Sequence, residues 1–178
     1  KHLVLSDMRK FAKVTVLETK GVHDSIHLKG VGPEPLEDSF DYAMFKSRLF
    51  TRPKGKIKTV LMDPMVIAGI GNIYSDEILW CASVHPLSLA GKIPENNLKD
   101  MFKATKELLR KGIHFGGDSM SDYRNIEGER GKFQDHHRAY QKHKTKCSKK
   151  GCGGILSRIV IGARSAHFCP VHQKFYDK

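Results

Sequence analysis

The sequence CSKKGC at residues 147–152, separated by 16 residues from CPVH at 169–172, decides how the C-terminal part of this chain folds. Three thiolates and one imidazole complete the tetrahedral ligand set that Zn²⁺ prefers, with two ligands at each end of a loop. No coordination position is left for water, so such a zinc ion is structural. We therefore expect one zinc ion held by Cys147, Cys152, Cys169 and His172. His167 or His143 could replace His172, and a disulfide or plain burial is the alternative to metal binding.

The segment between the two ligand pairs has the pattern of a β-hairpin. ILSRIVI at 155–161 reads as one strand, GARS at 162–165 as a turn, and AHF at 166–168 as the start of the return strand. A two-stranded hairpin of this size cannot bury enough apolar surface to be stable by itself. A metal ion would supply the missing stabilisation, so the hairpin and the ligand pattern support each other.

The charge balance indicates the kind of partner. Lys and Arg number 31 against 19 Asp and Glu, which gives a formal net charge of +12. This excess favours a polyanion, because neutralised phosphates release counterions; the alternative is a basic surface without a specific partner. No apolar run approaches the roughly 18 residues of a membrane span, so we expect no membrane association. Free thiols together with a zinc ligand set indicate a reducing cytosol.

The N-terminal residues predict part of a β-sheet. LVL at 3–5 and VTVL at 14–17 read as two strands joined through SDMRKF at 6–11. Two strands alone are an incomplete sheet, so we expect the chain to be the later part of a longer protein, with residues 1–32 ending an N-terminal β domain. Glycines and prolines between residues 30 and 35 mark the boundary to the next domain.

Residues 33–142 carry the signals of a helical domain. Apolar spacing predicts helical segments over 40–49, 56–62, 72–82 and 95–114 and a short one over 133–140. Asn72 is the expected cap of the third, and Cys81 is an apolar core residue near its end. The fourth has a continuous apolar stripe and stops at Gly116-Gly117. The glycine-rich, polar stretch that follows, to residue 132, reads as a loop.

The sequence GIGNIY at 69–74 is the second informative motif. Two glycines just before a helix let backbone amides approach a ligand closely, and the helix dipole favours an anion there. The motif alone is weak, since a tight turn between packed helices has the same pattern. It lacks the third glycine and the βαβ context of a dinucleotide site. With a net charge of +12, a nucleic-acid phosphate is the better match.

Several motifs, taken in order, resemble one family. GIGNIY at 69–74 followed by DEIL at 76–79 is similar to the helix–two-turn–helix of the formamidopyrimidine-DNA glycosylase and endonuclease VIII family. The resemblance covers nearly the whole chain and is closest to formamidopyrimidine-DNA glycosylase. The other matching segments are SDMRKF at 6–11, GPEPL at 32–36, Gly116-Gly117, Asp122-Tyr123, GERGKF at 128–133, GARS at 162–165 and Cys169-Pro170. The departures are the Cys-x4-Cys spacing and His172, where the family's usual finger has four cysteines in Cys-x2-Cys pairs.

The resemblance implies an α+β fold in three parts. These are a partial β-sandwich remnant over 1–32, a helical helix–two-turn–helix DNA-binding domain over 33–142 with a lesion loop near 117–132, and a β-hairpin zinc finger over 143–178. The implied partner is double-stranded DNA that contains oxidised bases or abasic sites. We also expect a monomer in a bacterial cytoplasm, associated with the nucleoid.

The implied activity is base-excision repair. The family removes oxidised purines such as 8-oxoguanine and formamidopyrimidines and then cleaves the strand at the abasic site as an AP lyase. An N-terminal proline attacks the sugar to form an imine, and a neighbouring glutamate moves protons. This chain begins Lys1-His2 and has no such pair. We therefore expect no catalytic residue within these 178 residues and no activity from this chain alone.

The resemblance also carries over seven DNA contacts: Arg9, Lys10, Phe11, Lys58, Asn72, Tyr123 and Arg164. The wedge, Arg9 and Phe11, fills the space of the flipped nucleotide, and Lys10 meets a phosphate. Asn72 and Arg164 grip the phosphates that flank the lesion, and Lys58 adds a further phosphate contact. Tyr123, in the lesion loop, touches the everted base. Without the resemblance, Phe11 would be a core aromatic residue and the loop an ordinary exposed one.

Two other function classes remain open at this point. One is a zinc-containing module that binds damaged DNA without catalysis. The other is a zinc-stabilised protein that binds RNA or the ribosome. The residues before Lys1 in the native protein discriminate the first, and a comparison of abasic duplex with structured RNA discriminates the second.

Overall fold

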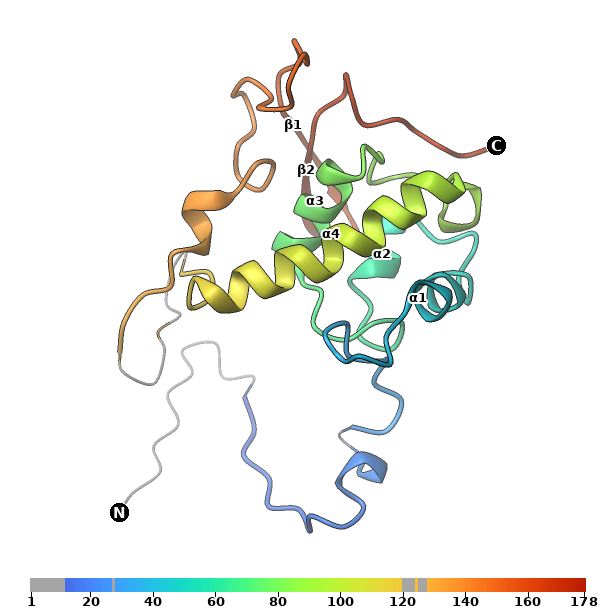
Figure 1. Cartoon of the computed structure of the whole chain (residues 1–178), viewed down its shortest axis with the longest axis vertical. Helices are drawn as coiled ribbons and strands as arrows, with labels where there is room; N and C mark the ends of the chain where they lie inside the picture. The colour runs from blue at the N-terminus through green and yellow to red at the C-terminus, as the bar shows by residue number, and fades with distance from the viewer. Residues whose placement is uncertain (1–11, 27, 120–123, 125–127) are drawn as a thin grey trace. The chain divides into compact units, whose positions relative to one another are not determined.

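The computed structural model of the chain describes residues 12–26, 28–119, 124 and 128–178. These residues divide into two compact units, Lys1–Gly30 and Val31–Lys178, each of which is described by itself (Figure 1). The predicted strand at 3–5 and the joining segment 6–11 lie outside the described residues.

The first unit contains only one short regular element among its described residues, the 3-10 helix η1 at Val22–Asp24. The predicted strand over residues 14–17 is wrong, because this stretch has no regular structure and the Val16 side chain is 95% exposed. A strand needs a neighbour for its N–H and C=O groups, and no described residue pairs with this stretch. Alternation of apolar residues was therefore an insufficient signal here.

The second unit is built on four α-helices: α1 at Tyr42–Leu49, α2 at Ile57–Leu61, α3 at Asn72–Cys81 and α4 at Glu95–His114. Two 3-10 helices, η2 at Ala90–Lys92 and η3 at Phe133–His136, complete it. All four predicted helical segments are confirmed. The short helix predicted over 133–140 ends at His136 instead. None of the helices in the described part of the chain combines the length and apolar character that a membrane span requires.

One apolar core joins the four helices. Its buried residues come from all of them and from the connections between them: Phe40, Phe45, Leu49, Ile57, Val60, Leu61, Val66, Ile67, Ile70, Ile78, Leu79, Ala82, Val84, Ala90, Ile93, Leu98, Met101 and Ala104. The helix α3 is central, because it contacts α2, α4 and the C-terminal hairpin (Figure 1). Cys81, at the end of α3, is partly buried against this core, and burial raises the pKa of its thiol.

The predicted hairpin is present. Strands β1 at Ser157–Ile161 and β2 at Arg164–Phe168 pair antiparallel, with Ile161 opposite Arg164. The two-residue turn needs positive φ at both positions, and Gly162 and Ala163 adopt φ of 54° and 61°. Strand β1 begins two residues later than predicted, because residues 154–156 pair with 144–147 instead: Leu156 N–H donates to the Thr145 carbonyl at 2.9 Å. The fold is therefore α+β, with four helices and a two-stranded antiparallel sheet.

Candidate nucleic-acid interface and metal centre

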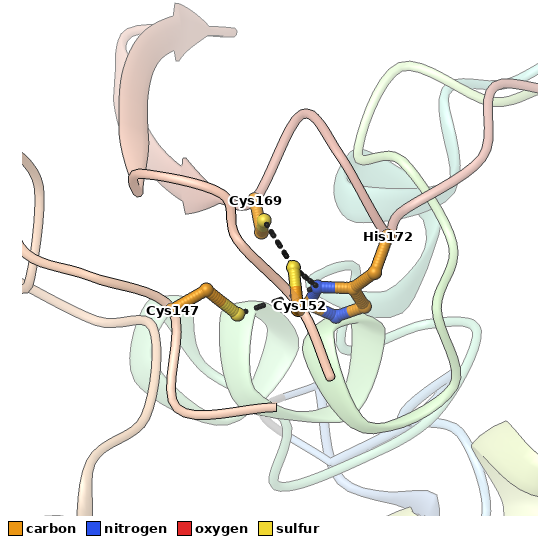
Figure 2. A group of neighbouring side chains, drawn as sticks. All are labelled: Cys147, Cys152, Cys169 and His172. Carbon is orange, nitrogen blue, oxygen red and sulfur yellow. Dashed lines mark hydrogen bonds between the residues drawn. The ribbon is translucent and has the colours of Figure 1, made fainter. Parts of the chain in front are cut away.

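The structure brings the four predicted metal ligands together (Figure 2). Their donor atoms all lie within 4.8 Å of one another. The Cys152 and Cys169 sulfurs are 3.6 Å apart, and His172 Nδ1 lies 3.4 Å from Cys147 Sγ and 3.8 Å from Cys152 Sγ. The edges of a tetrahedral zinc site are about 3.6–3.8 Å, from Zn–S and Zn–N bonds of about 2.3 and 2.1 Å. These three spacings therefore suit one tetrahedral ion.

The contacts of His172 select its ligating nitrogen. Nε2 lies 3.1 Å from the Trp80 carbonyl oxygen, which can only accept, so Nε2 carries the proton. Nδ1 then offers its lone pair to the side where the thiols lie, as metal-bound histidines do. Burial lowers the pKa of His172, which favours the neutral imidazole that a metal requires; the Trp80 carbonyl opposes this shift and Lys149 adds to it. His167 and His143, the alternatives from sequence, are not in the group.

Two residues that the sequence analysis missed shape the metal centre. A Cβ at Gly154 would lie 2.6 Å from Cys169 Sγ, so only glycine lets the backbone pass this close to the ligand. Gln173, which is buried, accepts from Cys169 N–H through Oε1 at 2.7 Å and donates to the Val84 carbonyl at 2.8 Å. It therefore fixes the second ligand pair against the helical core. Gly154 lies two residues after Cys152, and Gln173 directly follows His172. Nothing in the sequence around either residue predicts these contacts.

The N-terminus of α3 is open in the way that an anion site requires. Gly69 has φ of 75°, and a Cβ added at Gly71 would meet no atom within 4 Å. The predicted capping role of Asn72 is wrong: Gly71 occupies the N-cap position in extended conformation, and Asn72 is the first helical residue. The Asn72 side chain is therefore not used to cap the helix, and its Oδ1 is buried without a hydrogen-bond partner among the described residues.

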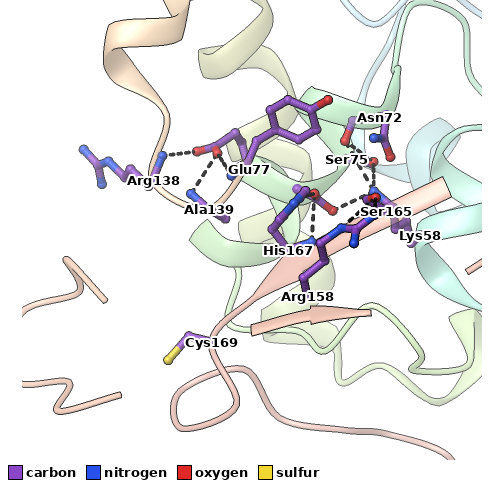
Figure 3. A network of polar contacts seen from close by, with 12 residues as sticks. Lys58, Asn72, Ser75, Glu77, Arg138, Ala139, Arg158, Ser165, His167 and Cys169 are labelled. Atoms are coloured by element: carbon purple, nitrogen blue, oxygen red, sulfur yellow. Dashed lines mark hydrogen bonds and ion pairs between the residues drawn. The ribbon is translucent and has the colours of Figure 1, made fainter. Parts of the chain in front are cut away.

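The position of Lys58 contradicts its predicted role as a phosphate contact. Its side chain is 1% exposed, and its ammonium donates to Asp76 Oδ1 at 2.6 Å, Ser75 Oγ at 3.0 Å and the Asn72 carbonyl at 3.3 Å. An ammonium has three donors, so none is left for DNA. Burial lowers the pKa of Lys58, and the Asp76 carboxylate opposes that shift. Lys58 is thus an internal cation behind the α3 N-terminus (Figure 3).

Asp76 ties α3 to the hairpin. While Oδ1 pairs with Lys58, Oδ2 accepts from the backbone N–H of His167 at 2.9 Å and from His167 Nδ1 at 3.0 Å. Asp76 is 1% exposed and His167 is 4% exposed. One buried carboxylate therefore connects α2, α3 and β2. Asp76 lies in the DEIL motif at 76–79, and nothing in that motif predicts this role.

Glu77, the next residue, holds the segment that precedes the hairpin. Its buried carboxylate accepts three backbone N–H groups, from Arg138 at 2.9 Å, Ala139 at 2.9 Å and Tyr140 at 2.8 Å. These N–H groups bond to a side chain rather than to a helix ladder, which is why the helix predicted over 133–140 stops early (Figure 3). Glu77 therefore fixes Tyr140 beside α3.

A cleft of about 320 Å³ connects the α3 N-terminus with the hairpin. It is lined by Asn72, Tyr140, Gln141, His143, Arg158, Ser165 and His167, and no carboxylate is among these described lining residues. Arg158 donates to Ser165 Oγ across the two strands at 2.9 and 2.6 Å. A cleft with many donors and no acid at a helix N-terminus suits an anionic group.

Arg164 follows the hairpin turn directly. Its side chain is exposed, and the guanidinium has no hydrogen bond or ion pair with any residue that the structure describes. Together with Gly162, Arg164 lines a second groove, of about 260 Å³, between the turn and α2. Of the predicted DNA contacts, Asn72 and Arg164 are thus placed on two elements that pack against each other, α3 and the hairpin.

The remaining predicted contacts, Arg9, Lys10, Phe11 and Tyr123, lie outside the described residues and stay predictions. The base of the loop that carries Tyr123 is described. There Gly131 N–H donates to Ser119 Oγ at 2.8 Å, and Ser119 N–H donates to Gln134 Oε1 at 3.0 Å. These bonds close the two ends of the loop on each other.

Comparison with known proteins agrees with this geometry. The family described as the formamidopyrimidine-DNA glycosylase H2TH domain matches residues 31–124. Formamidopyrimidine-DNA glycosylases from Herpetosiphon aurantiacus and Lactococcus lactis are 39% and 36% identical over 97% of this chain. The chain spans 62% of the length of each of these relatives.

Solved structures of formamidopyrimidine-DNA glycosylases also resemble this chain. The Lactococcus lactis Fpg in complex with DNA containing an abasic site has a TM-score of 0.85 at 36% identity, over 95% of this chain and 61% of its own. MutM in complex with DNA containing carbocyclic 8-oxo-G has a TM-score of 0.81 at 36% identity, over 93% of this chain and 59% of its own. Since the family match covers more than half of the residues, the chain belongs to the formamidopyrimidine-DNA glycosylase family.

Proposed function

We propose that this chain is the damaged-DNA-binding part of a base-excision-repair DNA glycosylase that removes oxidised purines and cleaves abasic sites. The observation that carries the proposal is the pairing of an open helix N-terminus, at Asn72, with a hairpin that presents an exposed arginine, Arg164. The names and DNA complexes of the relatives support the same substrate class. Such a DNA partner also agrees with the expected location at the nucleoid of a bacterial cytoplasm.

In this proposal the two elements grip the DNA backbone. The Arg164 guanidinium binds one phosphate, and the first backbone amides of α3, with the Asn72 amide group, bind a second. These contacts position the duplex without reading its sequence. The predicted wedge of Arg9 and Phe11 then fills the space of a nucleotide that has left the stack, and Tyr123 touches the everted base. A monomer suffices, because both grips belong to one chain.

We propose zinc as the ion at the metal centre, held by Cys147, Cys152, Cys169 and His172. The three thiols and the orientation of His172 support it. Zinc would supply no chemistry there, since four protein ligands leave no open position; it would hold the hairpin in place. Metal analysis tests the ligand set: we expect Cys169→Ala and His172→Ala to lose the zinc, and the matched variant His143→Ala to keep one ion per chain. Full zinc retention in both ligand variants would refute the assignment.

We further propose that these 178 residues bind DNA but do not excise the base. In the family, a proline–glutamate pair carries the glycosylase and AP lyase chemistry, and Lys1-His2 does not match that pair. Borohydride reduction traps the imine that a proline nucleophile forms. With duplex containing 8-oxoguanine, we expect no covalent adduct and no strand cleavage from this chain. A lesion-dependent adduct would place a nucleophile within it.

The binding proposal is tested by competition among three nucleic acids of equal length. A duplex with an abasic-site analogue should bind more tightly than an intact duplex, and both more tightly than structured RNA at the same salt concentration. Salt must be fixed because phosphate contacts make affinity strongly salt-dependent. Preference for the RNA would instead favour the RNA-binding alternative.

A further inference from the structure

The buried network around Asp76 lies between the two proposed grips on DNA. Asp76 is one helical turn after Asn72 on α3, and its partner His167 is three residues after Arg164 on β2. Residues four apart lie on the same side of a helix, so Asp76 is directly behind the Asn72 end of α3. The hydrogen bonds from His167 to Asp76 are therefore a direct link between the two elements that carry the grips.

This link resists being broken. Both oxygens of the Asp76 carboxylate are used, Oδ1 by Lys58 and Oδ2 twice by His167. All three residues are at most 4% exposed. Separating α3 from β2 would leave Oδ2 of the buried Asp76 carboxylate without both of its hydrogen bonds, which is unfavourable. The network thus holds the two elements in one relative position rather than merely close together.

Lys58 extends the network to the proposed binding residue itself. Its ammonium donates to the Asn72 carbonyl as well as to Asp76, and the Ser75 hydroxyl donates to the same carbonyl at 3.0 Å. The backbone of Asn72 is therefore fixed from inside the protein, while its side chain faces the cleft shared with Arg158 and Ser165. Lys58, which was predicted to contact DNA, instead holds the backbone of Asn72.

We propose that Asp76, with Lys58 and His167, is a positioning centre that sets the spacing of Asn72 and Arg164, so that the two phosphate contacts act as one unit. The inference rests on the proposed DNA-binding function. Two contacts on one rigid frame reinforce each other, because the second forms at high effective concentration once the first is made. If the frame is loosened, each contact contributes independently.

The test uses His167→Phe, which removes the Nδ1 bond to Asp76. It keeps the backbone N–H bond, the Lys58–Asp76 pair and an aromatic ring at that position. The matched control is His85→Phe. His85 also packs against β2, with its ring 4.4 Å from that of Phe168, but it takes no part in the Asp76 network. Zinc content and a melting curve confirm that both variants are folded.

Two readouts separate a positioning role from a general loss of stability. The first is a double-mutant cycle of Asn72→Ala and Arg164→Ala on abasic duplex. In the native background and in His85→Phe, we expect the two contacts to be coupled. The affinity loss of the double variant should then be smaller, by about fivefold or more, than the product of the two single losses. In His167→Phe, we expect this coupling to be smaller. Unchanged coupling in His167→Phe would overturn the inference.

The second readout needs no DNA. Residual dipolar couplings of the amides in α3 and in the hairpin should fit one alignment tensor in the native chain and in His85→Phe. They should fit one tensor less well in His167→Phe, because one of the two bonds that fix the hairpin to Asp76 is lost. A single-tensor fit in His167→Phe as good as in the native chain would also overturn the inference. If the native chain does not bind DNA, the proposed function fails, while the tensor comparison still decides whether the network sets the position of the hairpin.

Discussion

The helical core and the hairpin belong to one compact unit but are stabilised in different ways. The helical core buries 18 apolar residues in one continuous cluster. The cluster under the hairpin has five buried residues, Trp80, Ala139, Cys147, Leu156 and Cys169, and two of these are proposed metal ligands. Apolar burial can stabilise the first region alone, whereas the second, in our proposal, also needs a zinc ion on its cysteines and histidine. The proposed DNA interface spans both regions.

Removal of the metal should produce the largest difference between the two regions. A structural zinc site contributes an apparent binding free energy on the order of 10–16 kcal/mol, far more than the hairpin's small cluster can replace. After chelation we expect the amide signals of β1 and β2 to lose their dispersion in an NMR spectrum, while those of α1 and α4 keep theirs. Hairpin signals that stay unchanged in demonstrably zinc-free protein would contradict the comparison.

A change in the helical core should have the opposite pattern. Leu98 on α4 is 1% exposed, so Leu98→Ala creates a cavity and should lower the free energy of unfolding by about 2–5 kcal/mol. Because the hairpin is held by its own ligands, the variant should still bind one zinc ion per chain. Denaturant unfolding and metal analysis measure the two quantities. Loss of zinc from a folded Leu98→Ala protein would show that the two regions are not stabilised separately.

The smallest expected effects distinguish two kinds of DNA contact. Arg164→Ala should weaken intact and abasic duplexes alike and lower the slope of the salt dependence by about one counterion. Phe11→Ala should spare intact duplex and weaken abasic duplex by roughly 1–3 kcal/mol, the scale of one lost stacking contact. Its salt slope should not change, because no charge is removed. Salt titrations of both variants on both duplexes check this; equal weakening of the two duplexes by Phe11→Ala would make it a core residue.

The same comparison explains what could be predicted from the sequence. The bounds of α4 agree with the prediction, 95–114, because an apolar stripe and terminating glycines are local signals. The four candidate metal ligands were also readable, since ligand spacing is a property of the sequence itself. The strand expected over 14–17 failed because pairing depends on a neighbour that local alternation does not reveal.

Long-range polar contacts account for the errors at Lys58 and over residues 133–140. A lysine in a basic chain reads as a surface residue, but Lys58 is buried and pairs with Asp76, 18 residues away. Asp76 in turn accepts a hydrogen bond from His167, 91 residues further on. Nothing near Lys58 in the sequence signals that arrangement. The apolar, local part of the fold was therefore predictable, whereas the polar network that positions the candidate site became visible only in three dimensions.

We propose that the helical core and the hairpin, with zinc at its ligands, bind damaged DNA together. The most direct test is the affinity of the native chain for abasic-analogue duplex at fixed salt, measured with zinc bound and after zinc removal. We predict a loss of roughly tenfold or more, equivalent to about 1.4 kcal/mol, while the unfolding transition of the helical core persists. Undiminished affinity in the zinc-free protein would mean that the hairpin is not part of the DNA interface.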